Sequence, residues 1–181
     1  MSLARLALWV PSYLALLGCA TQVAIIPQLT DKTTPGRCQI RAQVRYEGKR
    51  DYLPAALVDD PAASHATAIR YSYEAQYGLN ETNPFIVAFN PLTLVGFPTG
   101  DDNFVVTGRV EVVRGDATLR SYAAAASMKR SSTVFYEGET FTEMRRRGLL
   151  LVGNNLSSQL CKDQEILTAL LNDSDNKSPR P

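Results

Sequence analysis

Two pairs of neighbouring acidic residues and one histidine have the clearest capacity for chemistry in this chain. Asp59-Asp60 and Asp101-Asp102 each place two carboxylates side by side, and His65 follows the first pair. Paired carboxylates can divide acid and base roles in hydrolysis when their surroundings separate their pKa values. Both pairs, however, stand beside turn residues, where aspartate is favoured because it hydrogen bonds to the backbone. Two interpretations stay open: an envelope hydrolase or glycan-binding enzyme that uses these five residues, and structural turns.

Other catalytic and cofactor-binding patterns are absent from the sequence. His65 is the only histidine, so no two-histidine metal site can form, and no Cys-x-x-Cys occurs. Neither a Gly-x-Ser-x-Gly elbow nor a Gly-rich phosphate-binding loop is found. We therefore expect no metal, no cofactor and no enzymatic activity.

The N-terminal segment has the layout of a secretory signal. Arg5 supplies a positive charge, the residues from Leu6 to Gly18 carry none, and a small residue precedes Cys19. This apolar run is too short for a membrane-spanning helix, which needs about twenty apolar residues. One alternative is an ordinary secretory signal that is cut near Ala20, and the other is a signal that ends in lipidation of the cysteine.

The tetrapeptide Leu-Leu-Gly-Cys at 16–19 resembles the lipobox of bacterial lipoproteins, in which the signal is cut before the cysteine and the thiol is lipidated. The resemblance implies a mature chain that begins at Cys19, carries acyl chains such as palmitate and lies on a membrane of the cell envelope. Ala20 stands where the family uses Asp as a signal to stay in the inner membrane. Because Ala20 stands there in place of Asp, the periplasmic face of the outer membrane is favoured.

Removal of residues 1–18 from the 181 leaves 163, enough for one domain with a real core. Arg5 is the only charge removed, so 18 basic and 18 acidic residues remain. This balance argues against a nucleic-acid partner, which usually selects a basic surface. We expect a signal peptide at 1–18, a lipid-anchored tether with one edge strand at 19–36, a domain at 37–171 and a disordered tail at 172–181. The expected partners are the membrane, through the lipid, and an envelope protein.

Cys38 and Cys161 are the two cysteines that follow Cys19. In an oxidising compartment two such thiols often pair. Cys38 falls on the inward face of its predicted strand, whereas Cys161 falls off the apolar stripe of the predicted C-terminal helix. A disulfide and two unpaired cysteines therefore both remain open.

Apolar and polar residues alternate with a period of two over 38–46, 69–77, 103–113 and 117–128, which predicts half-buried strands. The last two runs are joined by a tight hairpin at Gly115. Strands without intervening helices favour antiparallel connections. The predicted fold is therefore α+β: an antiparallel sheet of about four strands with a C-terminal helix packed on one face.

The period becomes helical near the C-terminus, where Gly153-Asn154-Asn155 can kink or break the helix. Arg145, Arg146 and Arg147 are consecutive, so at about 100° per residue they fan round the axis and form no single lateral patch. We expect a solvated set, with contact to anionic headgroups as the alternative. The apolar stripe consists of Phe141, Met144, Leu149, Val152, Leu156 and Leu160, continued by Ile166, Leu167 and Leu170.

An uncharged segment at 84–100 contains Phe89, Leu94 and Phe97 together with three prolines. Three prolines forbid one continuous helix and disfavour a central strand. The segment is either a connection packed into the core or an exposed hairpin that docks a partner or dips into the membrane. Its Thr-Leu-Val-Gly-Phe-Pro stretch at 93–98 is similar to a pattern in small uncharacterised Gram-negative lipoproteins, which implies no particular activity.

Overall fold

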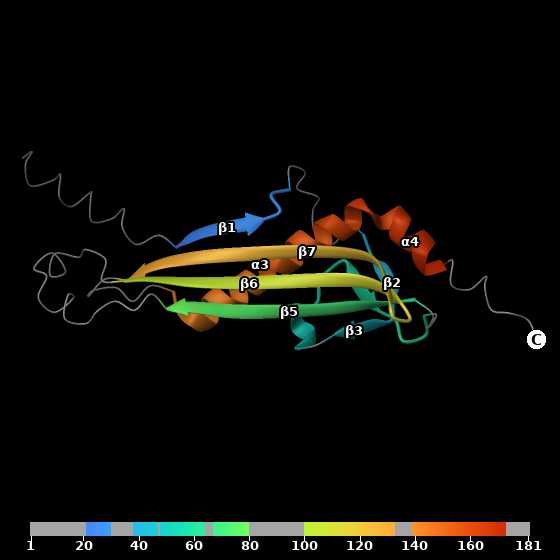
Figure 1. Ribbon diagram of the computed structural model, residues 1–181, viewed down its shortest axis with the longest axis horizontal. Helices are drawn as coiled ribbons and strands as arrows, with labels where there is room; N and C mark the ends of the chain where they lie inside the picture. The colour runs from blue at the N-terminus through green and yellow to red at the C-terminus, as the bar shows by residue number, and fades with distance from the viewer. Residues whose placement is uncertain are drawn as a thin grey trace, which may run out of the picture.

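The computed structural model describes residues 21–29, 38–46, 48–63, 67–79, 100–132 and 139–172. They form a five-stranded sheet, a two-stranded sheet and two C-terminal helices, α3 (Phe141–Lys162) and α4 (Gln164–Asn172). Figure 1 shows α3 lying along one face of the larger sheet, in the direction of its long strands. The predicted α+β class is confirmed, with two C-terminal helices in place of one.

Three long antiparallel strands form the centre of the larger sheet: β5 (Thr67–Leu79), β6 (Gly100–Arg114) and β7 (Ala117–Ser132). β1 (Gln22–Ile26) pairs antiparallel with β7, and β3 (Val44–Tyr46) pairs parallel with β5. The strand order is β1-β7-β6-β5-β3. About four strands was thus roughly right, but the expectation of a purely antiparallel sheet was wrong at β3.

The parallel pairing of β3 follows from the chain that connects it to β5. After β3 the chain passes through the short 3-10 helix η2 (Arg50–Tyr52) and β4 (Leu57–Asp59) before β5 begins. Such an excursion returns the chain to the same end of the sheet, as parallel neighbours require. Strand and turn patterns in the sequence do not reveal this crossover.

The single strand predicted over 38–46 is divided between two sheets. β2 (Ile40–Ala42) pairs parallel with β4, and β3 begins only after Gln43. Of the five residues predicted to point inward, Tyr46 is 37% exposed and the others are buried, namely Cys38, Ile40, Ala42 and Val44. A period of two indicates which side chains point inward, but it does not show which neighbour the backbone pairs with.

The β6–β7 hairpin is confirmed at the predicted position. Arg114 pairs with Ala117 across the turn, and Gly115 has φ 58°. This left-handed conformation is accessible to glycine at little cost, whereas most side chains resist it. The turn therefore sets the pairing beside it, and an irregularity between Val112 and Val113 then shifts the register for the rest of the two strands.

Helix α3 packs against the inner face of the sheet at unusually short range. A Cβ at Gly108 of β6 would lie 2.5 Å from Cγ1 of Val152, and a Cβ at Gly148 of α3 would lie 2.7 Å from Cγ2 of Val106. Both positions therefore need a residue without a side chain. The apolar residues of α3 that are buried against the sheet are Met144, Leu149, Val152, Leu156 and Leu160.

The helix is not broken at 153–155, where the sequence allows a kink or a break. α3 runs through these residues without a break, and the side-chain amide of Asn155 donates to the carbonyl oxygen of Pro27 at 2.8 Å. The helix ends instead at Lys162, and α4 follows Asp163. Of the residues predicted to continue the apolar stripe, Leu167 is buried whereas Ile166 is 47% exposed.

The packing of α3 predicts a sharp contrast between two of its residues. Leu156 is fully buried, and Arg146 is exposed. Leu156→Ala removes apolar contacts and leaves a cavity, so we expect it to lower the free energy of unfolding by about 2–5 kcal/mol. Arg146→Ala should change it by less than about 0.5 kcal/mol. Urea unfolding of both variants measures the difference, and equal losses would show that the buried face of α3 is assigned incorrectly.

Candidate functional site

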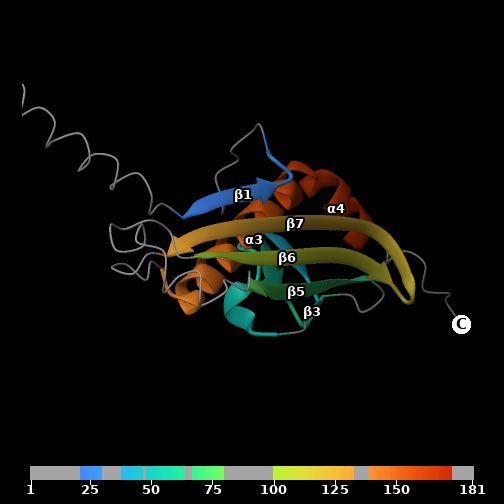
Figure 2. The same ribbon diagram turned by 60° about the vertical axis from the view of Figure 1, so that its left-hand side comes forward.

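The larger sheet has one face covered by helix and one that no described residue covers. Successive side chains of a strand point to opposite faces, and the residues that alternate with the core point away from α3. In Figure 2 the strands lie in front and the helices behind them. We call this uncovered side the open face; its residues are Arg70, Ser72 and Glu74 of β5, Thr107, Arg109 and Glu111 of β6, and Ala123, Ala125 and Ser127 of β7.

A hollow with a volume of about 640 Å³ lies over the middle of the open face. Its floor includes the small residues Ala123 and Ala125 of β7, which pair with Arg109 and Thr107 across the β6–β7 ladder. The end of β1 forms one side, where Ile26 is 68% exposed. The hollow is lined by Ile26, Pro27, Ser72, Tyr73, Glu74, Thr107, Gly108, Arg109, Ala123, Ala124 and Ala125.

Charged groups border one side of this hollow. A carboxylate oxygen of Glu111 lies 3.4 Å from Arg109 and the other lies 3.7 Å from Arg70. Half-exposed pairs of this kind contribute only about 0.2–1 kcal/mol each, so they can exchange partners at little cost. The hollow thus combines apolar contact area with hydrogen-bonding and ionic groups, which suits binding of a polypeptide surface.

The three predicted acidic residues whose side chains are described bond to the backbone or form an ion pair. Asp59 accepts a hydrogen bond from the amide of Val44 at 3.1 Å, and Asp60 accepts one from the amide of Ala62 at 3.0 Å. The contact of Asp60, two residues along the chain, is the kind that the turn interpretation predicts, whereas Asp59 bonds to a backbone amide fifteen residues away. Asp102 instead forms an ion pair with Arg130, in which both side chains are mostly buried.

The two acidic pairs lie at opposite ends of the sheet. Asp59 contacts the start of β3, which pairs with Ile69 near the beginning of β5, whereas Asp102 pairs with Leu79 at the end of β5. Ten strand residues at about 3.4 Å each separate the two positions by roughly 30 Å. The pairs therefore cannot share acid and base roles in one site.

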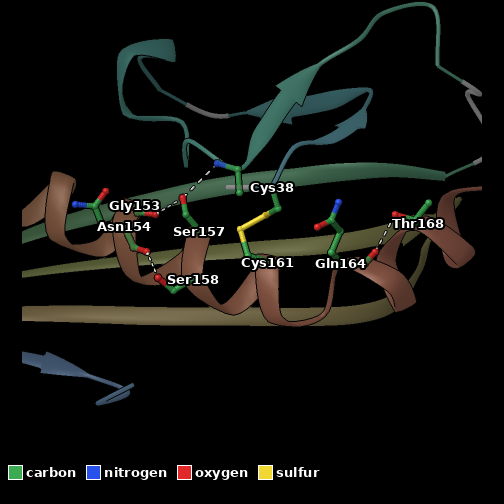
Figure 3. Close-up of a disulfide and its surroundings, with 9 residues drawn as sticks. Cys38, Gly153, Asn154, Ser157, Ser158, Cys161, Gln164 and Thr168 are labelled. Carbon is green, nitrogen blue, oxygen red and sulfur yellow. Dashed lines mark hydrogen bonds between the residues drawn. A yellow bond between two sulfur atoms is a disulfide. The ribbon is translucent and has the colours of Figure 1, made fainter. Parts of the chain in front are cut away.

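Cys38 and Cys161 form a disulfide, with 5.6 Å between their Cα atoms. Figure 3 shows that it joins the segment before β2 to the last turn of α3. One turn away, the hydroxyl of Ser157 accepts a hydrogen bond from the amide of Ala56 at 3.3 Å and donates to the carbonyl of Gly153 at 2.8 Å. The disulfide and the hydrogen bond from Ala56 to Ser157 hold the two-stranded sheet on α3. Cys161 lies off the apolar stripe because it faces this small sheet and not the larger one.

A polar cluster closes the junction between α3 and α4. Asp163 accepts from Arg120 at 2.5 Å and from the hydroxyl of Tyr122 at 3.0 Å. Burial, followed by this hydrogen bond, raises the pKa of Tyr122 to about 12, so the phenol stays protonated at neutral pH. The cluster fixes the turn between the helices.

Several predicted residues lie outside the described part of the chain. They are Cys19 with the signal segment, His65, and Phe89, Leu94 and Phe97 of the uncharged segment; the side chain of Asp101 is also not described. Over the ranges that are described, no three potential metal ligands come together. Neither α3 nor α4 is long and apolar enough to cross a membrane.

The open face could not be identified from the sequence as a site. The only signal in the sequence is the series of small residues at Ala123 and Ala125, which alternate with core residues in β7. No known protein family matches the chain, and a search of curated proteins finds no relative. The geometry of the face and the chemistry of the chain therefore carry the functional argument.

The disulfide generates a prediction about stability. Its cysteines are separated by 123 residues, so reduction releases a long loop in the unfolded chain. In the chain-entropy account, loss of such a cross-link lowers the free energy of unfolding by about 2–5 kcal/mol. Urea unfolding with and without dithiothreitol should show this loss. A Cys38→Ser/Cys161→Ser variant should have the lower stability in both conditions; continued sensitivity to the reductant would contradict the assignment.

Proposed function

We propose that this chain is a membrane-anchored lipoprotein of the periplasm, held by acyl chains on Cys19, that acts as a non-enzymatic binding or assembly factor in the cell envelope. The observation that carries the proposal is the hollow of about 640 Å³ on the open face. An uncovered sheet face with small residues at its centre offers room for a partner's side chains.

The partner that fits this face is an envelope protein that presents a convex polypeptide surface. Ala123, Ala125 and Ile26 supply apolar contact, and Glu74 with Arg109 supplies opposite charges at the rim. Mixed apolar and charged surfaces of this kind resemble the interfaces of non-obligate complexes, in which charge sets orientation and apolar area supplies affinity.

The position of β1 supports the anchor. This strand begins at Gln22, three residues after Cys19, and pairs with β7. A lipid on Cys19 would therefore attach almost directly to the edge of the sheet. Several acyl chains give durable attachment, because each buried CH₂ contributes about 0.8 kcal/mol. The enzymatic alternative receives no comparable support, since the carboxylate pairs lie at opposite ends of the sheet.

Lipidation is tested by metabolic labelling with a clickable palmitate. We expect the wild-type chain to incorporate the label and to fractionate with outer membranes, because the thiol of Cys19 accepts the lipid. Cys19→Ser removes that thiol and should abolish labelling. A Cys38→Ser/Cys161→Ser variant serves as the matched control, and we expect it to keep the label. Labelling that persists in Cys19→Ser would contradict the anchor.

Binding at the open face is tested by filling its hollow. Ala123→Trp places a large side chain among the lining residues, whereas Ser127→Trp adds the same side chain on the same strand and face outside them. A photo-crosslinker at Thr107 should capture an envelope protein in cells, and Ala123→Trp should reduce that product at least about tenfold, since it removes the space for a contact at the centre of the interface. Ser127→Trp should leave it nearly unchanged. The same product from a crosslinker at Thr118, near the β6–β7 turn, would contradict the assignment of the face.

A further inference from the structure

We infer that the end of the sheet at which α3 begins is a membrane-docking surface, on which Arg145 and Arg146 bind the anionic headgroups of the bilayer. The inference rests on the proposed function, because the lipid on Cys19 brings the domain to that bilayer. It adds an orientation and a second contact that lipidation alone does not specify. We call this end of the molecule the anchor end.

The chain between the lipid and the sheet is too short to act as a spacer. Gln22, the first residue of β1, follows Cys19 by three residues. At about 3.3–3.6 Å per extended residue, the start of β1 lies within roughly 10 Å of the lipidated sulfur. β1 therefore occupies residues 22–26 of the predicted tether at 19–36, and the anchor end must lie at the membrane surface.

Four other chain segments meet at the same end. Gln22 pairs with Lys129 near the end of β7, Leu79 at the end of β5 pairs with Asp102, and Gly100 at the start of β6 pairs with Ser132. Figure 1 shows the first turn of α3 beside these strand ends and the β6–β7 hairpin at the opposite end. α3 thus begins at the anchor end, and its first two turns carry Arg145 and Arg146.

The three arginines fan round the helix axis, but they share a direction along it. Every Cα–Cβ bond of a helix tilts toward the N-terminus, so long side chains lean back over the preceding turn. Arg145 and Arg146 lie one turn after Phe141 and are exposed, and neither pairs with a described residue. Their guanidinium groups can therefore reach the plane of the anchor end, although they form no lateral patch.

The acidic side chains described at this end are already engaged. Asp102 pairs with Arg130, and Glu139 lies 3.3 Å from Arg147. Glu143 completes the capping box with Thr140, whose amide hydrogen bonds to it, and this contact lowers the pKa of the Glu143 carboxyl. Because these carboxylates are matched within the protein, the charge of Arg145 and Arg146 remains available to an outside anion.

Aromatic residues complete the surface in the way that membrane interfaces favour. Tyr77 is 50% exposed, and the centroid of its ring lies 5.5 Å from that of Phe141 in an edge-on contact. Arg130 stacks over Phe141 at 4.8 Å from the ring centroid. Rings with one apolar and one polar side concentrate at the level of the headgroups, where basic side chains also gather on anionic leaflets.

The orientation can be measured without relying on lipidation in the cell. The chain from Cys19 retains every described residue, and its thiol can be coupled to a maleimide phospholipid in vesicles. An environment-sensitive fluorescent amino acid is placed at Thr142, in the first turn of α3, or at Asp116, in the opposite hairpin; both positions are exposed. On vesicles of phosphatidylcholine with phosphatidylglycerol, we expect the fluorescence emission of the probe at 142 to shift to shorter wavelength and that of the probe at 116 to stay unchanged.

Charge removal decides whether headgroups are the ligand. Arg145→Ser/Arg146→Ser should weaken docking about 25-fold, roughly fivefold for each arginine near an anionic surface, and abolish the shift. Arg41→Ser/Arg45→Ser makes the same charge change on exposed arginines of β2 and β3 and should keep it. Thermal unfolding should be the same for both double variants. High salt should also remove the shift, because screening weakens the attraction.

Two results would overturn the docking surface. The first is an equal shift at 142 and 116, and the second is a shift at 142 that is unchanged by phosphatidylglycerol, salt or the arginine substitutions. Failure of palmitate labelling in cells would instead count against the proposed lipoprotein. Because the maleimide lipid replaces that modification, the two failures are distinguishable.

Discussion

The close packing of α3 on the inner face of the sheet is the constraint on which the rest of the structure depends. Gly108 and Gly148 let backbone and side chains approach where any Cβ would collide. This approach buries Val152 and Leu156 completely, and each contributes about 1.5–3 kcal/mol. Because α3 packs on this face, over β6 and β7, the other face carries no described helix, and both proposed contact surfaces follow from where the helix lies.

Sequence periodicity predicted the parts of the fold that depend on single side chains. The hairpin at Gly115, the inward residues of 38–44 and the buried stripe from Met144 to Leu160 all follow from local patterns. The parallel pairing of β3 did not, because it depends on a crossover through the second sheet. The uninterrupted helix at 153–155 was also missed, since Asn155 is stabilised by a partner at Pro27, far away in the sequence.

The candidate surfaces were harder to predict than the fold, for a physical reason. The residues of the open face come from three strands, and each strand contributes only small or common polar side chains. No single segment is unusual, so the hollow exists only after the register has placed these residues side by side. Asp59, Asp60 and Asp102, which were conspicuous in the sequence, instead bond to backbone amides and to Arg130.

The pairing of β1 with β7 also determines the order in which the chain can fold. β1 contacts residues 125–129, and Pro27 is bonded to Asn155, which lies 128 residues further along the chain. Contacts between residues so far apart in the sequence form late, because the entropy lost on closing the long loop must be overcome before the contacts contribute favourable energy. β1 is therefore among the last strands to pair, although it is the first to be synthesised. Until β7 and α3 are in place, β1 has neither the strand with which it pairs nor the side chain of Asn155 that bonds to Pro27.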